Sequence, residues 1–512
     1  MMTMRATSPE KSVHLKANMV VLGGGAGIAA AVAAAENGAT DIIVLERQGH
    51  YGGHSMFPQG LFACESPVQK REHIITDRDE CFKTIMKWAH WGRIEPRVIR
   101  AYLNKSGDTI RWFQEKGVDF EIKTWYPSQK VRGFHWPLKP NGEYALGADL
   151  IKILLKESER QGVKLLLHTR AQNIIRGLKG NITGVTAVND DGQEIHIKTG
   201  SVIIATGSFA GNIELLKKYC PDYYDGMFID EGSSHHSGDG LLMAEKIGAA
   251  IADYVPIEHS GPHPDYSKNK GSLAASMKEP IAGIVREPYT VWVNKMGKRF
   301  VDETAGYILP EAGNAILRQP EKLMYTLFDD RIRQNAEEKG FVIGRGWGKQ
   351  ESEQRVKVPG LGAVLRKRAG EGKESLVKID DSWGGIARNI GADSAVLAQE
   401  IDEYNSFCQQ GYDEIFAKER RYLVPLDKPP FYAIRCVAPL GQTMGGIKVN
   451  ERMEVLDKDY HVIPGLYAMG DIADGWSAQT YCGECCGTSF GFAINSGRIA
   501  GESAAKYVLR KE

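Results

Sequence analysis

The start of the chain alternates apolar runs with a stretch of small residues. Residues 19–22 (MVVL) form a continuous apolar run, which is typical of a strand buried on both faces. A glycine-rich turn, an alanine-rich helical stretch and a second apolar run at 41–46 (DIIVLE) follow. The pattern predicts a strand, a tight turn, a helix and a parallel strand that ends on an acid.

Similar patterns continue to about residue 245. Residues 146–155 have helical spacing and residues 163–169 form an apolar strand. Two short strands at 182–188 and 195–197 flank a turn of the Asp-Asp-Gly type, which predicts a hairpin. Residues 201–207 are a buried strand that ends on a glycine turn, typical of a second approach to a nucleotide.

The two ends of the chain predict two segments of one nucleotide-binding domain. Near the C-terminus, a short apolar strand beginning at Ile463 ends on Gly470-Asp471. The middle is richer in loops, proline and charge, and the first pattern resumes at Pro429-Pro430. The predicted fold is α/β, with a Rossmann-like domain in two segments (15–245 and 426–512) and an inserted α+β capping domain (246–425).

The first turn has the chemistry of a pyrophosphate site. Glycine lets the backbone turn sharply and lets amides approach phosphate, and the following helix presents free N–H groups. Glu46 lies 22 residues after Gly24, a suitable reach for the ribose hydroxyls. The register of the turn stays open, because Gly27 as the third glycine puts Leu22 first, whereas Gly23 as the first puts Ile28 third.

Composition excludes several other classes. The 512 residues contain 64 Lys+Arg and 64 Asp+Glu, which gives no reason to expect nucleic acid as a partner. No apolar run reaches the roughly 18 residues of a membrane span, and the N-terminus lacks the apolar region of a secretory signal. Eight unevenly spaced cysteines predict reduced thiols in a cytoplasmic protein. Cys482, Cys485 and Cys486 lack a fourth ligand nearby, so we predict packing residues rather than a metal site.

Six ordered motifs give the chain a resemblance to the fumarate reductase/succinate dehydrogenase flavoprotein superfamily. They are 52–55 (GGHS), 205–207 (ATG), 237–240 (SGDG), 293–303 (VNKMGKRFVDE), 443–446 (TMGG) and 497–501 (GRIAG). The resemblance spans about 17–507. It implies FAD, bound noncovalently or covalently, a cap over the isoalloxazine, and hydride exchange between flavin N5 and a substrate carbon beside an activating group.

The predicted FAD-binding residues follow from the glycine-rich turn and from this resemblance. They are Gly23, Gly24, Gly25, Ala26, Gly27, Glu46, Arg47, Gly52, Gly53, His54, Ser55, Gly60, Ala171, Ala205, Thr206, Gly207, Asp239, Gly470, Asp471 and Ser489. His54 matches the histidine that carries FAD covalently in the membrane-bound relatives. The resemblance leaves open whether His54 forms this bond or only contacts the cofactor.

The substrate side departs from the fumarate reductases. They have an arginine proton donor where this chain has Tyr307, and they clamp a carboxylate with a histidine and an arginine where it has Gly441 and Glu484. A dicarboxylate would then face like charge without a partner, which costs several kcal/mol in a dry site. The departures therefore argue against fumarate as the substrate.

The replacements are similar to those of the 3-ketosteroid dehydrogenase branch. There a tyrosine at the Tyr307 position transfers the proton, and positions matching Tyr481 and the Cys485 amide hold a ketone oxygen. His263 and Arg286 match substrate-side residues of the fumarate reductases. Other interpretations stay open: loop tyrosines usually serve packing, His263 could cap a loop, and Arg286 could pair with a nearby glutamate, Glu287 or Glu279.

The sequence therefore predicts an FAD-dependent oxidoreductase acting on a CH–CH bond beside a carbonyl. Tyr307, Tyr481, His263 and Arg286 are the predicted catalytic residues, and Gly441, Gln442, Glu484 and Cys485 the predicted substrate-binding residues. The expected partner is a small unsaturated carbonyl compound, with an external electron donor or acceptor that the sequence does not identify. The alternatives are a reductase of an unsaturated monocarboxylate, such as urocanate, and an electron-transferring subunit of a complex.

Overall fold

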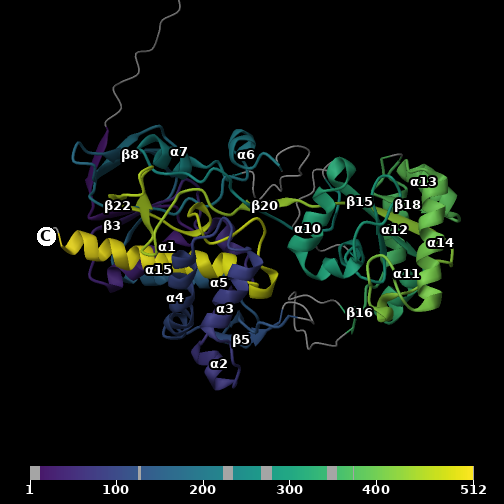
Figure 1. Ribbon diagram of the computed structural model, residues 1–512. Coiled ribbons are helices and arrows are strands. Elements are labelled where there is room, and N and C mark those ends of the chain that lie inside the picture. The colour runs from purple at the N-terminus through teal and green to yellow at the C-terminus, as the bar shows by residue number, and fades with distance from the viewer. Residues whose placement is uncertain are drawn as a thin grey trace, which may run out of the picture.

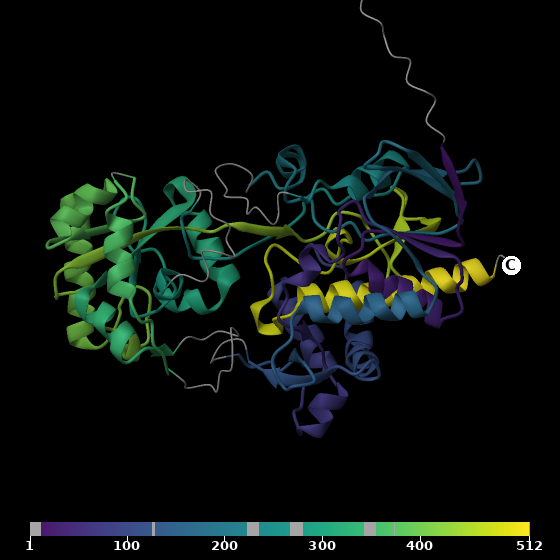
Figure 2. The same cartoon turned by 180° about the vertical axis from the view of Figure 1, so that it is seen from behind.

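The computed structural model describes residues 12–124, 129–222, 235–266, 280–342, 355–372 and 374–510. The chain forms two lobes, a nucleotide-binding lobe that contains both chain ends and a capping lobe built from the middle of the chain (Figure 1). Residues 431–443 run between the lobes, as Figures 1 and 2 both show.

A six-stranded sheet forms the centre of the nucleotide-binding lobe. Its order is β21 (Glu454–Leu456), β22 (Val462–Ala468), β11 (Val202–Ile204), β2 (Met19–Leu22), β3 (Ile42–Leu45) and β7 (Lys164–Leu166). All neighbours pair in parallel except the edge strand β21. Strands from both ends of the chain thus lie side by side, which confirms the predicted α/β fold.

Helices of small residues cover one part of this sheet. Helix α1 (Gly27–Glu36) is buried from Gly27 to Ala34 and packs against α15 (Thr488–Leu509) and α5 (Gly147–Arg160). A Cβ added at Gly501 of α15 would lie 2.2 Å from the Ala30 carbonyl oxygen of α1. The alanine-rich and glycine-containing sequences therefore permit a close approach of the two helices (Figure 2).

A four-stranded sheet adjoins the six-stranded one. Its order is β1 (Val13–Lys16), β10 (Glu194–Lys198), β9 (Ile182–Asn189) and β8 (Thr169–Arg176), and the antiparallel β9–β10 pair confirms the predicted hairpin. The single strand expected at 163–169 is wrong. The chain turns at His168, where φ is 51°, so residues 164–166 join one sheet and Thr169 begins a strand of the other.

Residues 61–124 and 129–138 form an arm below the nucleotide-binding lobe in Figure 1. It contains helices α2 (Pro67–Arg71), α3 (Arg78–Trp88) and α4 (Pro96–Gln114) and a small sheet of β4 (Leu61–Phe62), β6 (Phe134–Leu138) and β5 (Asp119–Lys123). Helices α4 and α15 pack together. Their contact includes the hydrogen bond from Arg498 Nη1 to Thr109 Oγ1, at 2.8 Å.

The capping lobe is an antiparallel sheet covered by helices. Its sheet contains β13 (His263–Pro264), β19 (Phe431–Val437), β15 (Leu323–Asp329), β14 (Val291–Val293) and β18 (Val377–Asp380). Its helices are α9 (Pro280–Ile284), α10 (Leu309–Leu317), α11 (Asp330–Glu338), α12 (Leu361–Ala369), α13 (Trp383–Ile390) and α14 (Ser394–Gln410). The lobe has an apolar core of its own, from Tyr266 to Ala438.

Strand β19 corrects one sequence expectation. Residues 431–437 were expected to rejoin the nucleotide-binding lobe, but they pair with β15 in the capping sheet. The chain returns through β20 (Leu440–Thr443), which pairs with β12 (Ile257–His259) on the nucleotide-binding side. An apolar strand can serve either sheet, so its pattern alone could not assign it. Within the described residues, no helix is both long and apolar enough to cross a membrane.

Candidate active site

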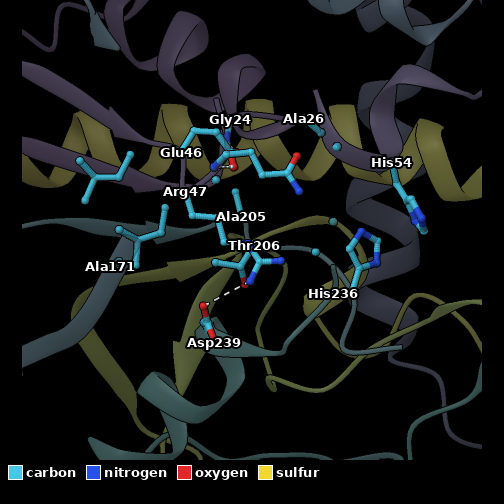
Figure 3. Close-up of a pocket in the computed structure, with 18 of the residues that line it drawn as sticks. Gly24, Ala26, Glu46, Arg47, His54, Ala171, Ala205, Thr206, His236 and Asp239 are labelled. Carbon is cyan, nitrogen blue, oxygen red and sulfur yellow. Dashed lines mark hydrogen bonds and ion pairs between the residues drawn. The ribbon is translucent and has the colours of Figure 1, made fainter. Parts of the chain in front are cut away.

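A deep cleft opens at the carboxyl ends of the parallel strands, where α/β folds of this kind bind ligands. The space within the cleft, counted together with the open solvent at its mouth, is about 1000 Å³. Residues from both sequence segments line it, among them 23–26, 46–48, 52–55, 205–207 and 469–471. Figure 3 shows Ala171 near one end of the cleft and His54 with His236 near the other.

The structure settles the register of the glycine-rich turn. Gly23 has a φ of +115°, and a Cβ there would lie 2.3 Å from the Ala205 carbonyl oxygen. A Cβ at Gly27 would lie 2.8 Å from Ala205 Cβ, so Gly27 permits the close packing of helix α1 on the sheet. Gly23 therefore makes the turn, and Gly27 serves packing without lining the cleft.

Glu46 stands where the turn and the second strand meet. Its two carboxylate oxygens accept hydrogen bonds from the Gly24 and Gln48 backbone N–H groups, at 2.8 and 2.9 Å. The acid lines the cleft beside the glycine turn, as its spacing predicted. This is the position from which a carboxylate can reach ribose hydroxyls.

A cluster of two arginines and one aspartate lines the cleft on the Ala171 side. The sequence predicted Arg47 and Asp239 there. Arg170 binds both carboxylate oxygens of Asp239, at 2.8 and 2.9 Å, and Arg47 lies 3.6 Å from the same carboxylate. Arg47 also donates to Ser237 at 2.6 Å. Arg170 was missed, although its place beside Ala171 at the start of a strand is a usable signal.

Two histidines lie close together towards the other end of the cleft. His54, on the short helix η1 (Gly53–Met56), has its ring centroid 3.9 Å from that of His236 in an edge-to-face contact. Burial, followed by the nearby charges of His54 and Arg47, lowers the pKa of His236 to about 2. His236 therefore stays neutral. No spacing in the sequence predicts that it meets His54.

Buried polar atoms in the cleft fit a polar ligand such as FAD. Thr206 Oγ1, His236 Nδ1 and Asp471 Oδ1 are buried without a hydrogen-bond partner among the described residues. Each would carry a desolvation cost of about 1–3 kcal/mol, which ligand hydroxyls or amides would offset. Burial, and then the charge of Glu258, raise the pKa of Asp471 to about 8.

Two other predicted FAD-binding residues lie outside the cleft lining. A Cβ at Gly60 would lie 2.4 Å from the His135 carbonyl oxygen, so this glycine permits a close approach to strand β6. Ser489 Oγ instead accepts a hydrogen bond from Gln442 Nε2, at 2.8 Å. The structure thus gives both residues contacts within the protein rather than in the cleft.

Tyr307 ends the short helix η3 (Glu303–Tyr307) in the capping lobe, and it is partly buried. Its ring centroid lies 6.3 Å from that of Tyr422. Burial above all, then the Glu287 carboxylate and a hydrogen bond with Tyr422, hold the pKa of Tyr307 well above its usual value of 10.0. The phenol therefore keeps its proton at neutral pH.

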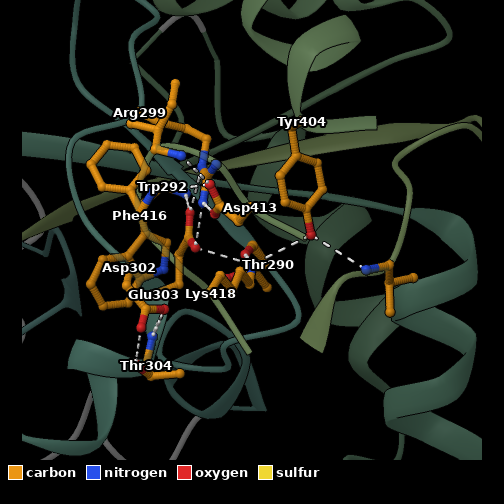
Figure 4. A network of polar contacts seen from close by, with 12 residues as sticks. Thr290, Trp292, Arg299, Asp302, Glu303, Thr304, Tyr404, Asp413, Phe416 and Lys418 are labelled. Carbon is orange, nitrogen blue, oxygen red and sulfur yellow. Dashed lines mark hydrogen bonds and ion pairs between the residues drawn. The ribbon is translucent and has the colours of Figure 1, made fainter. Parts of the chain in front are cut away.

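A buried ionic network holds the helix that ends at Tyr307 (Figure 4). Glu303 pairs with Lys418 at 3.0 Å and with Arg299 at 3.1 Å, and Arg299 also pairs with Asp413 at 2.9 Å. All four side chains are 2 % exposed or less. Two cations and two anions balance each other, so the network ties the 413–422 loop, which carries Tyr422, to η3.

His263 and Arg286 meet in the capping lobe, as expected for residues of one site. Arg286 Nε donates to the Pro262 carbonyl oxygen at 2.8 Å, and its Nη2 lies 2.7 Å from His263 Nδ1. Ser260 Oγ lies 2.9 Å from His263 Nε2. Arg286 thus contacts His263 as well as backbone; Glu279, one alternative partner, lies outside the described residues.

Tyr481 and Cys485 are arranged differently from the sequence expectation. The Tyr481 hydroxyl accepts a hydrogen bond from the Gly487 N–H at 2.7 Å, and the Cys485 N–H donates to the Cys482 carbonyl at 3.2 Å. Tyr481 lines a second, smaller cavity with Trp88 and Trp476. The Cys485 amide is thus used within its own turn, and this geometry does not offer it to a ketone oxygen.

The two lobes meet beside Tyr307, and the junction is acidic. A Cβ at Gly483 would lie 2.8 Å from Ile308 Cγ2, so the loop that carries Glu484 touches the residue after Tyr307. Glu484 Oε2 accepts from the Lys130 N–H at 3.2 Å. Burial, and then the charge of Glu484, raise the pKa of Glu311.

Gln442 contacts an acid that the sequence analysis missed. Its Nε2 donates to Glu258 Oε2 at 2.6 Å, and Gly441, its neighbour in β20, lies near the Glu258 carbonyl. Glu258 and Gln442 face each other across the β12–β20 pair. The alternation of β12 could have indicated this acid, but its pairing partner lies 184 residues away.

Comparison with known proteins identifies the family of the chain. The model of the FAD binding domain family matches residues 18–488. A vinyl phenol reductase of Lactiplantibacillus plantarum is 31% identical over 96% of this chain and 97% of its own length. A cytochrome fumarate reductase of Shewanella frigidimarina is 29% identical over 98% of this chain and 78% of its own.

A solved structure shows the same fold. The 3-ketosteroid Δ1-dehydrogenase of Sterolibacterium denitrificans aligns with a TM-score of 0.74 at 20% identity, over 96% of this chain and 99% of its own. The resemblance stated from the six motifs is therefore confirmed, as is FAD as the cofactor. The chain belongs to the FAD binding domain family and is an FAD-dependent oxidoreductase of the fumarate reductase type.

Proposed function

We propose that this protein reduces a C=C bond conjugated to a carbonyl or an equivalent activating group in an uncharged substrate, with Tyr307 as the proton donor. The chemistry that bound FAD supplies is hydride transfer to one alkene carbon. The chain's own part is to bind the alkene at the junction of the lobes and to protonate the other carbon.

The protonation state of Tyr307 carries this proposal. A dehydrogenase needs a base that removes a proton, whereas a reductase needs an acid that donates one. Burial above all raises the pKa of Tyr307, so at neutral pH the phenol is protonated and has a proton to donate, and its raised pKa makes it a weak acid. Tyr422 and the ionic network behind η3 fix the phenol at the lobe junction.

Electrostatics at the junction supports an uncharged substrate. Glu258, Glu311 and Glu484 are carboxyl groups there, and burial raises the pKa of the first two. A substrate carboxylate would either meet like charge or force these acids to take up a proton, and both cost free energy in a poorly solvated place. Arg286 keeps its positive charge, and its guanidinium contacts the Pro262 carbonyl and His263 in the capping lobe.

The relatives support a reductase over a dehydrogenase. The Lactiplantibacillus plantarum relative, which aligns over nearly its whole length, is named a vinyl phenol reductase. The ketosteroid dehydrogenase shares the fold at 20% identity, which does not carry over its direction of reaction.

A single-turnover assay under anaerobic conditions tests the proposal. Chemically reduced enzyme should be reoxidised by 2-cyclohexenone or 4-vinylphenol and not by fumarate. Tyr307→Phe should retain FAD and slow this step roughly 100-fold, the usual scale for a lost acid–base group. Tyr432→Phe, which removes a buried phenol that donates to Asp330 elsewhere in the capping lobe, is the matched control. Reoxidation by fumarate alone, or full activity of Tyr307→Phe, would refute the proposal.

A further inference from the structure

Three tyrosines of the capping lobe form a chain of ring contacts that ends at Tyr307. The ring centroid of Tyr422 lies 6.3 Å from that of Tyr307 and 5.2 Å from that of Tyr289, and both contacts are edge to face. Tyr422 is 5% exposed, whereas Tyr289 is only partly buried. The contacts therefore lead from a side chain that solvent reaches, through a buried phenol, to the proposed proton donor.

The buried ionic network holds Tyr422 and Tyr307 together. Lys418 pairs with Glu303 at 3.0 Å, and neither side chain is exposed. Glu303 begins η3, which Tyr307 ends, and Lys418 is followed by the short helix η5 (Arg420–Tyr422). A hydrogen bond also links Tyr307 to Tyr422. Because a hydroxyl group can donate one hydrogen bond and accept others, Tyr422 can donate to the Tyr307 oxygen while Tyr307 donates to a substrate.

The charged groups beside these two phenols differ in sign. The charge of the buried Glu287 acts on Tyr307. The guanidinium carbon of Arg421, which also pairs with Glu419 at 2.8 Å, lies 4.8 Å from the centroid of the Tyr422 ring. A negative charge left on Tyr307 would face a carboxylate in a poorly solvated place, whereas a negative charge on Tyr422 would lie beside a cation. The arrangement therefore favours moving this charge away from Tyr307.

We propose that Tyr422 is a proton relay, which passes its hydroxyl proton to the Tyr307 oxygen in the same step in which Tyr307 protonates the substrate. The inference rests on the proposed function, and Tyr422 acts through Tyr307 without touching the substrate. The Tyr307 O–H bond breaks as the substrate gains a C–H bond, and the Tyr422 O–H bond breaks as Tyr307 regains a proton. Water on the Tyr289 side then returns a proton to Tyr422. The relay thus takes one proton from water and needs no further oxidant or reductant.

A double-mutant cycle tests whether Tyr422 works through Tyr307. The measurement is the anaerobic single-turnover reoxidation of the reduced, FAD-loaded enzyme by 2-cyclohexenone. Tyr422→Phe keeps the ring and removes only the hydroxyl group, and it should slow this step about tenfold, less than the loss of the acid itself. In the Tyr307→Phe background the same substitution should cause no further loss, because the relay has no acceptor there. Tyr432→Phe, the matched control, should have no effect in either background.

Solvent deuterium separates proton transfer from a role in positioning alone. The hydride of reduced FAD and the Tyr307 proton exchange with solvent in both enzymes, so Tyr422→Phe removes only the relay proton from the comparison. The ratio of the rates in H2O and D2O should be smaller in Tyr422→Phe than in the wild-type enzyme, and Tyr432→Phe should keep the wild-type ratio. An unchanged rate or an unchanged isotope ratio in Tyr422→Phe, or equal slowing in both backgrounds, would overturn the relay.

The Tyr307→Phe enzyme distinguishes failure of the relay from failure of the proposed function. If Tyr307→Phe slows reoxidation and Tyr422→Phe does not, the relay is wrong and the proposed function stands. If Tyr307→Phe is as fast as the wild-type enzyme, the proposed function fails and the relay fails with it.

Discussion

The floor of the cleft, which we define by the glycine turn, Thr206 and Asp471, uses its polar groups differently from the junction of the two lobes. On the floor, Thr206 and Asp471 present buried polar atoms that have no partner among the described residues. At the junction, Gln442, Tyr481 and the Cys485 amide are engaged with neighbouring protein groups. The floor is thus built to hold a large polar cofactor, whereas at the junction we propose that Tyr307 acts on the substrate.

Because of this difference, substitutions in the two regions should have different effects. A change on the floor should remove the cofactor and with it every activity. A change at the junction should alter rate or selectivity and leave the cofactor bound. The following predictions test that separation, beginning with the largest expected effect.

Gly23→Val should abolish FAD binding. The φ of +115° is strained for a β-branched residue, and a Cβ would lie 2.3 Å from the Ala205 carbonyl oxygen. The measurement is the ratio of flavin to protein absorbance after purification. Gly53→Ala changes a cleft glycine with open space around it and should keep most of the cofactor. A Gly23→Val enzyme with full FAD content would show that the turn is not the cofactor site.

Lys418→Met should destabilise the capping lobe by about 3 to 5 kcal/mol, because it leaves the buried Glu303 and Asp413 with one cation. Denaturant unfolding measures the loss. Lys83→Met, which breaks an exposed pair with Glu80 one helical turn away, should cost far less. Equal losses in the two variants would contradict the importance of the buried network.

Much of the floor could be predicted from sequence, because its signals are local. The glycine turn, Glu46 and Gly470-Asp471 each follow directly after a short apolar strand, so their placement at one sheet edge required only the order of strands. The junction could not be predicted in the same way. Glu258 meets Gln442 only through a strand pair that spans 184 residues, and strand β19 carries an apolar pattern that either sheet could use.

The hydrogen-bond partners at the junction could not be predicted from the sequence either. Nothing in the sequence shows that the Gly487 N–H donates to the Tyr481 hydroxyl or that the Cys485 amide closes its own turn. The predicted roles of Tyr481 and Cys485 came from aligned positions, and hydrogen-bond partners depend on side-chain packing that an alignment does not carry.

Glu484→Gln should widen the tolerance for carboxylated substrates about tenfold, measured as the ratio of kcat/KM for a cinnamate to that for the matching uncharged enone. The substitution removes one negative charge, which would repel a substrate carboxylate. Burial, and then this charge, raise the pKa of Glu311 at the junction. FAD content should not change, because Glu484 does not line the cleft. An unchanged ratio would show that the acids do not select against carboxylates.

His54→Ala should have the smallest effect. The edge-to-face contact with His236 engages the His54 ring, so we expect His54 to contact FAD without a covalent bond. Acid precipitation should then release all yellow colour to the supernatant from both the wild-type and the His54→Ala enzymes. Colour that stays in the wild-type pellet, and is lost from the pellet in His54→Ala, would establish a covalent bond.

The pH dependence of substrate reduction tests the central claim, that Tyr307 acts as an acid at the lobe junction. The measurement is the rate of flavin reoxidation by 2-cyclohexenone in a single turnover between pH 6 and pH 9, in the wild-type and Tyr307→Phe enzymes. Because the pKa of Tyr307 is raised above 10.0, the phenol stays protonated across this range. The account predicts no alkaline decline due to Tyr307 and a roughly 100-fold slower Tyr307→Phe enzyme at every pH. A decline centred below pH 9 that Tyr307→Phe removes would contradict it.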